Sequence, residues 1–125
     1  MRVMTKLFFA DTYALIELIG GGTNYKPYLN FVIVTTKYNL IELYYYLLRT
    51  YTLETAERYL ELYSKFEVPI SYNCIRIGMQ FKLKHQKDKL SYIDCIGYAL
   101  SIELGVKFLT GDQKFKNLEN VEFVK

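Results

Sequence analysis

The stretch that most limits the possible folds of this chain is residues 91–112, SYIDCIGYALSIELGVKFLTGD. Ser91 is a preferred N-cap residue with Asp94 three positions later, and Gly105 is a preferred residue just past the end of a helix. The residues after Gly105 form a short, mostly apolar run, as expected of a buried strand. The stretch therefore predicts a helix, a turn and a strand, with Asp94 at the start of the helix and Asp112 just past the strand. In open α/β sheets, ligands bind beyond the carboxyl ends of the strands, so these two aspartates mark a candidate site.

Length and composition indicate one ordinary domain. The chain has 125 residues, of which 51% are hydrophobic and 23% are charged, so we expect one domain over residues 1–125 with a buried core. The net charge of +3 is too small to argue for nucleic acid by itself, although it does not oppose an anionic substrate. Cys74 and Cys95 indicate neither a zinc site nor a disulfide framework, and a reducing compartment fits them best.

The first residues are basic and then apolar, as in a secretory signal. Asp11 and Glu17 interrupt the apolar run, and no run approaches the roughly 18 apolar residues of a membrane span. We therefore expect a soluble, cytoplasmic protein with no membrane contact.

Strands and helices alternate with short linkers, which predicts a compact α/β domain with a mostly parallel sheet. The expected strands are 6–10, 31–35, 106–109 and 121–124, with 31–35 central and 121–124 at an edge. The expected helices are 13–19, 37–50, 53–66, 71–84 and the helix ending at Gly105. Residues 24–28 are expected to be a loop. The glycines at 20–22 are expected to end the first helix, because no lysine–serine pair follows to make a phosphate loop.

Glu42 is the one charged residue in the apolar middle of the 37–50 helix. A helix that is apolar on every side is expected to be buried, and a lone buried carboxylate needs protonation, a partner or a cation. Arg49 lies seven residues on, about 10 Å along the helix axis, which is far for a partner within the helix. Glu42 therefore needs a partner from elsewhere in the fold.

Three of the four aspartates, Asp11, Asp94 and Asp112, follow a strand or begin a helix, whereas Asp88 lies in a basic loop. Each of the three could simply cap a helix or close a turn. If they converge with Glu42, however, their negative charges require protonation or cations. Oxygen ligands of this kind suit Mg²⁺ or Mn²⁺, and phosphodiester hydrolysis is the reaction class that follows.

Three segments, FFADTYALIEL, VTTKYNLIEL and LSYIDCIGYALSIELGVKFLTGDQKF, resemble the PIN domain family over essentially the whole chain. The resemblance is to its single-domain, VapC-like toxin ribonucleases. It implies a Rossmann-like, three-layer α/β/α fold with helices on both faces of the sheet. It also implies an acid quartet that binds divalent metal for RNA cleavage, placed here at Asp11, Glu42, Asp94 and Asp112.

Further candidate residues surround the quartet. Thr110 matches the hydroxyl residue usual before the last aspartate, and Asn39 and Thr12 are further candidates for supporting the acids or touching substrate. The candidates for holding the RNA backbone are Lys114, Lys116, Lys84, Lys87 and Lys89. The 82–89 cluster has the alternative of being a solvated loop, and His85 is expected at the surface.

The resemblance further implies a homodimer and an antitoxin partner. Residues 20–30 are shorter and richer in glycine than is usual in the family, so the helix often found there, which contributes to antitoxin contact, is expected to be missing. The alternative functions are a PIN-fold module that binds RNA or protein without turnover and, more remotely, a phospho-acceptor receiver domain. The sequence does not identify the RNA.

Overall fold

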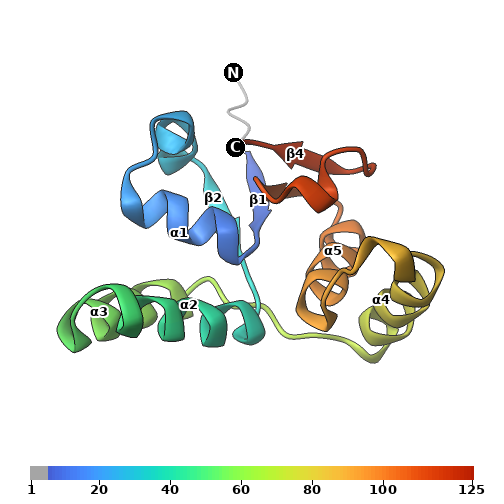
Figure 1. The fold of residues 1–125 in the computed structure, drawn as a ribbon, viewed down its shortest axis with the longest axis horizontal. Helices are drawn as coiled ribbons and strands as arrows, with labels where there is room; N and C mark the ends of the chain where they lie inside the picture. Colours follow the sequence, from blue (N-terminus) through green and yellow to red (C-terminus); the bar gives the residue numbers. More distant parts are fainter. Residues whose placement is uncertain (1–5) are drawn as a thin grey trace, which may run out of the picture.

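The structure is a computed structural model that describes residues 6–125. Four parallel strands form one sheet in the order β2–β1–β3–β4 (Figure 1). The strands are β1 (Leu7–Ala10), β2 (Val32–Val34), β3 (Lys107–Thr110) and β4 (Val121–Phe123). The predicted parallel α/β sheet is therefore confirmed, and β4 lies at an edge as expected.

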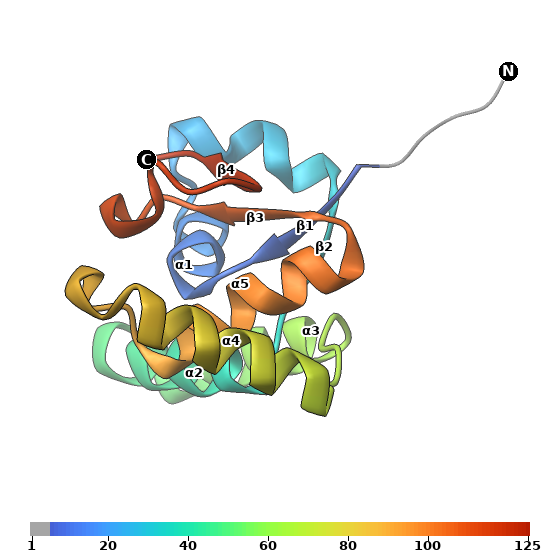
Figure 2. The same cartoon turned by 90° about the vertical axis from the view of Figure 1, so that its right-hand side faces the viewer.

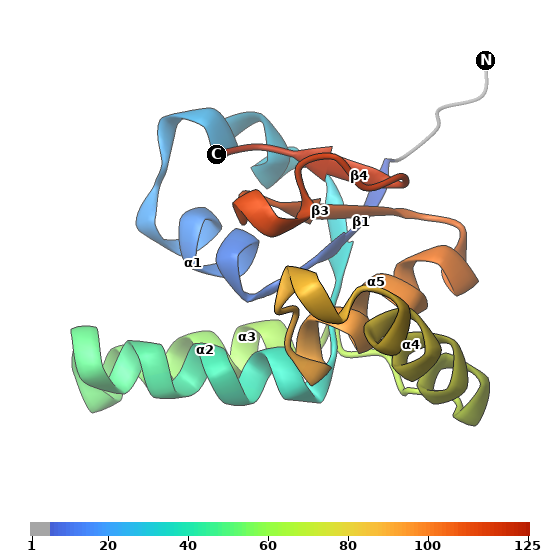
Figure 3. The ribbon, with the colours of Figure 1, turned by 45° about the vertical axis from the view of Figure 1, so that its right-hand side comes forward.

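Helices cover both faces of the sheet, which confirms the three-layer α/β/α architecture (Figures 2 and 3). One face carries α1 (Thr12–Gly20), the 3₁₀ helix η1 (Thr23–Asn30), α2 (Lys37–Thr50) and α3 (Leu53–Ser64). The other face carries α4 (Tyr72–Lys84), α5 (Tyr92–Leu104) and the 3₁₀ helix η3 (Gln113–Phe115), with η2 (Gln86–Asp88) between α4 and α5.

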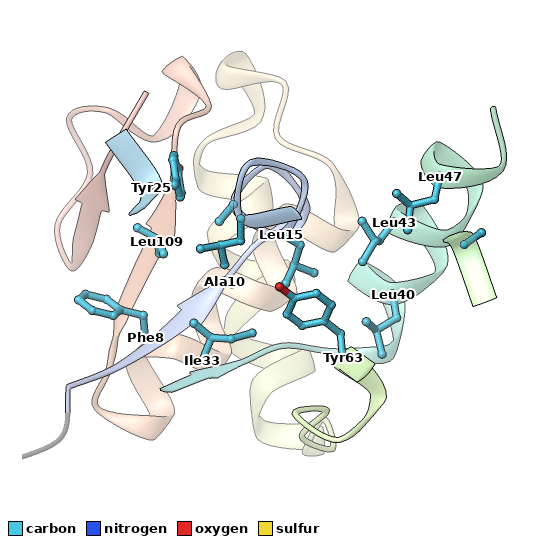
Figure 4. Packing of buried hydrophobic residues seen from close by; sticks show 13 residues of the cluster. Phe8, Ala10, Leu15, Tyr25, Ile33, Leu40, Leu43, Leu47, Tyr63 and Leu109 are labelled. Atoms are coloured by element: carbon cyan, nitrogen blue, oxygen red, sulfur yellow. The ribbon is translucent and has the colours of Figure 1, made fainter. Parts of the chain in front are cut away.

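The sheet is buried on both faces because successive side chains of a strand point to opposite sides. In β1, Phe8 and Ala10 join the core beneath α1 and α2, whereas Phe9 joins the core beneath α5. Leu109 and Phe108 of β3 divide in the same way. Figure 4 shows the first of these cores, which reaches from β1 and β3 to the buried leucines of α2.

The predicted helix after Ser91 is confirmed as α5. Ser91 caps it with a capping box, and Gly105 follows its end with φ +70°. At Gly97 the helix lies close against the sheet, because an added Cβ would come within 2.9 Å of the Phe9 ring. This contact sets how closely the middle of α5 packs on β1 and β3.

The prediction that residues 31–35 form a central strand is wrong. β2 pairs with β1 alone among the named strands, and it lies at the edge of the sheet. Beyond Val34 only Thr35 continues the pairing on the outer side, by donating to the Phe66 carbonyl and accepting from the Val68 amide. The apolar run arises because Ile33 packs into the core beneath α1 and α3 and Val34 packs against the core on the opposite face, although Val32 is exposed.

The prediction of a loop at 24–28 is also wrong, since these residues lie in η1. The helix expected to be missing is thus replaced by a short 3₁₀ helix. It holds the end of the chain, because the Tyr25 hydroxyl donates to the Val124 carbonyl at 2.6 Å and Asn24 donates to the Lys125 carbonyl at 3.1 Å.

Two further expectations concern cysteines and membranes. Cys74 and Cys95 are free, buried thiols. No helix within residues 6–125 is long and apolar enough to cross a membrane.

Candidate active site

Asp11 follows β1 directly and caps α1. Its carboxylate accepts a hydrogen bond from the Ala14 amide at 2.9 Å and another from the Thr110 hydroxyl. Only 5% of the residue is exposed. The pKa of this carboxyl is raised to about 7, mainly by burial; the two hydrogen bonds lower it, and the nearby Asp94 and Asp112 add to the rise. Asp11 is therefore a buried carboxyl whose charged form is disfavoured mainly by loss of water and, to a smaller extent, by two neighbouring acids.

Thr110 ties Asp11 to Asp112. Its hydroxyl donates to Asp11 and accepts from the Asp112 amide at 3.0 Å. Asp112 in turn caps η3 by accepting from the Lys114 amide at 3.0 Å. Gly111 makes this tight arrangement possible, because a Cβ there would come within 2.4 Å of the Val124 carbonyl oxygen.

Glu42 is exposed, so the prediction that α2 is buried on every side is wrong. The helix buries one stripe, including Leu43 and Leu47, and leaves apolar residues as well as Glu42 at the surface. The expectation that Glu42 needs a partner from another element is nevertheless met, because the Thr12 hydroxyl of α1 donates to it at 2.6 Å.

A chain of hydrogen bonds orients the Thr12–Glu42 pair. Asn39 is buried one turn before Glu42, and its amide nitrogen donates to the Thr12 hydroxyl at 3.1 Å. The Asn39 side-chain oxygen accepts from the Thr36 hydroxyl at 2.6 Å, which fixes the orientation of the amide. Asn39 and Thr12 therefore lie where a residue supporting Glu42 is needed.

Asp94 has the structural role that the sequence suggested. It closes the capping box of α5, accepting from the Ser91 amide at 2.9 Å while its own amide donates to the Ser91 hydroxyl at 3.0 Å. This role does not remove it from the site, because both residues line the same cavity as the other acids.

A cavity of about 400 Å³ brings all four predicted acids together. Asp11, Asp94 and Asp112 enter from the carboxyl ends of β1 and β3 and from the start of α5, and Glu42 enters from α2. As they stand, no three acidic, histidine or cysteine side chains within residues 6–125 are close enough to enclose one ion. The arrangement is a shared acidic cavity rather than a closed coordination shell.

Arg49, Tyr46 and Tyr13 also line the cavity, and the sequence interpretation missed them. Tyr46 and Arg49 follow Glu42 by four and seven residues in α2, so all three lie on one stripe of the helix. That spacing was a usable signal. It was overlooked because Arg49 was considered only as a direct partner for Glu42.

The predicted basic residues divide into two groups. Lys114 lines the cavity, whereas among the described residues that line it there is no Lys116, Lys84, Lys87 or Lys89. Lys84, Lys87 and Lys89 lie in or near η2, and Lys116 directly follows η3. His85 is half-buried, stacks on Phe81 and pairs with Asp88, so it is less exposed than expected.

The sequence pattern of the PIN domain family matches residues 8–121, and the chain therefore belongs to the PIN domain family. The comparison with curated proteins found no match.

Several solved structures share the fold. A toxin–antitoxin complex from Klebsiella pneumoniae matches at 20% identity and a TM-score of 0.71, covering 94% of this chain and 96% of the other. VapBC2 of Rickettsia felis, bound to a promoter DNA fragment, matches at 17% identity and a TM-score of 0.72, covering 94% of this chain and 97% of the other. VapC20 of Mycobacterium tuberculosis, a toxin that cleaves the sarcin–ricin loop, matches at 17% identity and a TM-score of 0.73, covering 94% of this chain and 96% of the other.

Proposed function

We propose that this protein is a metal-dependent endoribonuclease. The observation that carries the proposal is the cavity lined by Asp11, Glu42, Asp94 and Asp112, in which burial and the neighbouring aspartates raise the pKa of Asp11 to about 7. Uncompensated carboxylates of this kind are favourable only if a cation or a proton joins them. Membership of the PIN family and the fold shared with an RNA-cleaving toxin support RNA as the substrate.

The donor set fits Mg²⁺ or Mn²⁺, because all four groups offer carboxylate oxygens, which hard divalent ions prefer. Asp11, Glu42, Asp94 and Asp112 are the residues that would hold the ion. When bound, such an ion supplies Lewis-acid stabilisation of the phosphate and an activated water.

The remaining residues of the site have supporting roles. Thr110 keeps Asp11 and Asp112 in register, and Thr12 with Asn39 directs the Glu42 carboxylate into the cavity. Lys114 would bind the RNA backbone inside the cavity. The lysines outside it, Lys116, Lys84, Lys87 and Lys89, would steer the RNA along the surface.

We propose further that the protein is the cytoplasmic toxin of a type II toxin–antitoxin pair. The fold shared with toxin–antitoxin complexes supports this. So does an apolar groove of about 520 Å³ between α2 and α3, where Ile41 and Tyr45 are 60% and 63% exposed. A partner protein that covers this groove would bury apolar surface now in water. Size-exclusion chromatography of the chain alone would separately test the homodimer that the family resemblance suggests.

The test of the nuclease is cleavage of a structured RNA pool with Mn²⁺, with Mg²⁺ and with EDTA. Wild-type protein should cut only with a divalent ion, and Asp94→Asn should abolish cutting, because it removes one of the four carboxylate charges. Asp88→Asn is the matched control, since Asp88 is exposed and pairs with His85 away from the cavity.

Cleavage by Asp94→Asn at the wild-type rate would show that the site is assigned wrongly. RNA binding without cleavage by the wild type, across substrates and ions, would favour the PIN-fold binding module instead.

A further inference from the structure

Among residues 6–125, Arg49 is the one arginine that lines the acidic cavity. It lies in the last turn of α2, on the same helix stripe as Glu42 and Tyr46. Despite the four nearby acids, Arg49 makes no ion pair within 4.0 Å in the part of the chain that the structure describes. Its guanidinium instead lies 5.1 Å from the centre of the Tyr45 ring.

This position leaves the arginine available to an anion. Stacking on an aromatic ring restrains the side chain through a cation–π contact but uses none of its N–H donors. An arginine whose role was to balance the acids would be expected to pair with one of them. Within the described residues, Arg49 is thus a cation that is restrained by Tyr45, has no hydrogen-bond or ion-pair partner, and lies in the same cavity as the acids.

The negative charge of the cavity means that a cation is needed there to bind an RNA phosphate. Four carboxylates line it, and Arg49 and Lys114 are the two cationic residues among the described lining. RNA phosphates carry negative charge and are repelled by carboxylates, so cations at the cavity wall must hold the backbone there. Lys114 belongs to η3 and Arg49 belongs to α2, so the two cations come from different elements of the site.

We propose that Arg49 binds a backbone phosphate of the RNA inside this cavity, through two N–H groups of its guanidinium. This inference rests on the proposed function, because it names a substrate contact of the same site. It makes Arg49 a substrate-positioning residue rather than a ligand of the metal. The guanidinium fork matches the two non-bridging phosphate oxygens in a way that a lysine does not.

The experiment measures binding of a fluorescein-labelled single-stranded RNA of random sequence by fluorescence anisotropy. EDTA prevents metal-dependent hydrolysis, and the titration is repeated over a range of salt concentrations. Arg49→Gln should weaken binding roughly ten-fold and lower the salt slope by about 0.7, the value for one contact to a single strand. Arg49→Lys should keep the slope while losing part of the affinity.

Arg58→Gln is the matched control. Arg58 also stacks on a tyrosine, with its guanidinium 5.2 Å from the Tyr59 ring centre, but it is in α3 and does not line the cavity. It should leave both the affinity and the salt slope as in the wild type.

Two results would overturn the inference. One is no RNA binding by the wild type. The other is an unchanged salt slope in Arg49→Gln, even with lower thermal stability or altered Mn²⁺ affinity, since that pattern means a purely structural role. Cleavage assays decide the nuclease separately. If Arg49→Gln cleaves RNA with the wild-type KM and binds it with the wild-type salt slope, the inference about Arg49 is wrong but the nuclease proposal stands. If Arg49→Gln has a lower salt slope but the wild type does not cleave RNA, the nuclease proposal is wrong but the inference about Arg49 stands.

Discussion

Asp11 is the residue where stability and the proposed chemistry oppose each other. Its pKa is about 7 in the fold against 3.8 for the unperturbed group, mainly because it is buried. Below about pH 4 both folded and unfolded chains hold the proton. As pH rises towards 7 the unfolded chain loses it first, so Asp11 lowers the free energy of unfolding progressively, by on the order of 4 kcal/mol above the folded pKa.

Asp11→Asn should therefore make the metal-free protein more stable above about pH 7 and leave it almost unchanged near pH 4. The asparagine oxygen can still accept from Ala14, and its amide can donate to Thr110. Urea unfolding in EDTA across this pH range measures the effect. Wild type and Asp11→Asn with the same pH dependence would mean that Asp11 ionises normally in the fold.

Thr12 and Asn39 should act as one unit on Glu42. Thr12→Val removes the hydroxyl that donates to Glu42, and Asn39→Leu removes the amide that positions that hydroxyl. Each change should lower the cleavage rate roughly ten-fold or more, because supporting hydrogen bonds of this kind contribute about that much to metal sites. The double variant should be little worse than either single one. If the double variant loses the product of the two single losses in cleavage rate, Thr12 and Asn39 do not act on Glu42 through the same hydrogen bonds.

At this scale the sequence predicted that four acids converge, and they do line one cavity, although part of the reasoning was wrong. Asp11, Asp94 and Asp112 could be placed because caps and strand ends have local signatures. Glu42 was expected to be buried because the residues around it are apolar, but apolar residues do not reveal which side of a helix packs. The spacing of Arg49 from Glu42 on one stripe of α2 was a usable signal, but only the assembled cavity shows that Arg49 shares it with the three aspartates as well.

At the scale of elements, the contact of α5 with the sheet should be sensitive to one methyl group. In Gly97→Ala the new Cβ would come within 2.9 Å of Phe9 and 3.4 Å of Phe108, two rings that stack on each other 5.5 Å apart. Both are fully buried, so the expected loss is about 1–3 kcal/mol in the free energy of unfolding. Chemical denaturation measures it.

Gly20→Ala is the control for that experiment. Gly20 ends α1, its φ is not in the left-handed region, and no atom lies within 4 Å of an added Cβ. This change should be neutral or stabilise by up to about 1 kcal/mol, because alanine has less freedom than glycine in the unfolded chain. Equal losses in the two variants would show that α5 does not approach the sheet so closely.

The positions of the helices and strands in the sequence were largely predictable, whereas the elements that each one packs or pairs with were not. The helices from α2 to α5 have caps and periodicity in the sequence itself. The order of strands depends on long-range pairing, so the β-branched run of β2 could not show that it lies at the edge. The 3₁₀ helix η1 was missed because Pro27 and the preceding glycines suggest a loop, whereas tertiary contacts from Tyr25 to the end of the chain stabilise it.

At the scale of the whole molecule, a divalent ion should stabilise the fold. An ion that binds only the folded chain at about 100 times its Kd adds about 2.7 kcal/mol. Mn²⁺ should therefore raise the Tm of wild-type protein in a calorimetric scan, and EDTA should reverse the rise. Asp112→Asn should lose most of the increase, and Asp88→Asn should keep it. A Tm that no divalent ion raises would contradict binding at the acids.

The order of the strands has one more consequence. β1 is made early, yet its neighbour on one side is β3, and Asp112 follows β3 close to the end of the described chain. Asp11 meets its Thr110 partner only after β3 has been synthesised, 99 residues later in the chain. On the ribosome, the four acids therefore cannot come together before residue 112 has been made, so the proposed site cannot form from the first half of the chain alone.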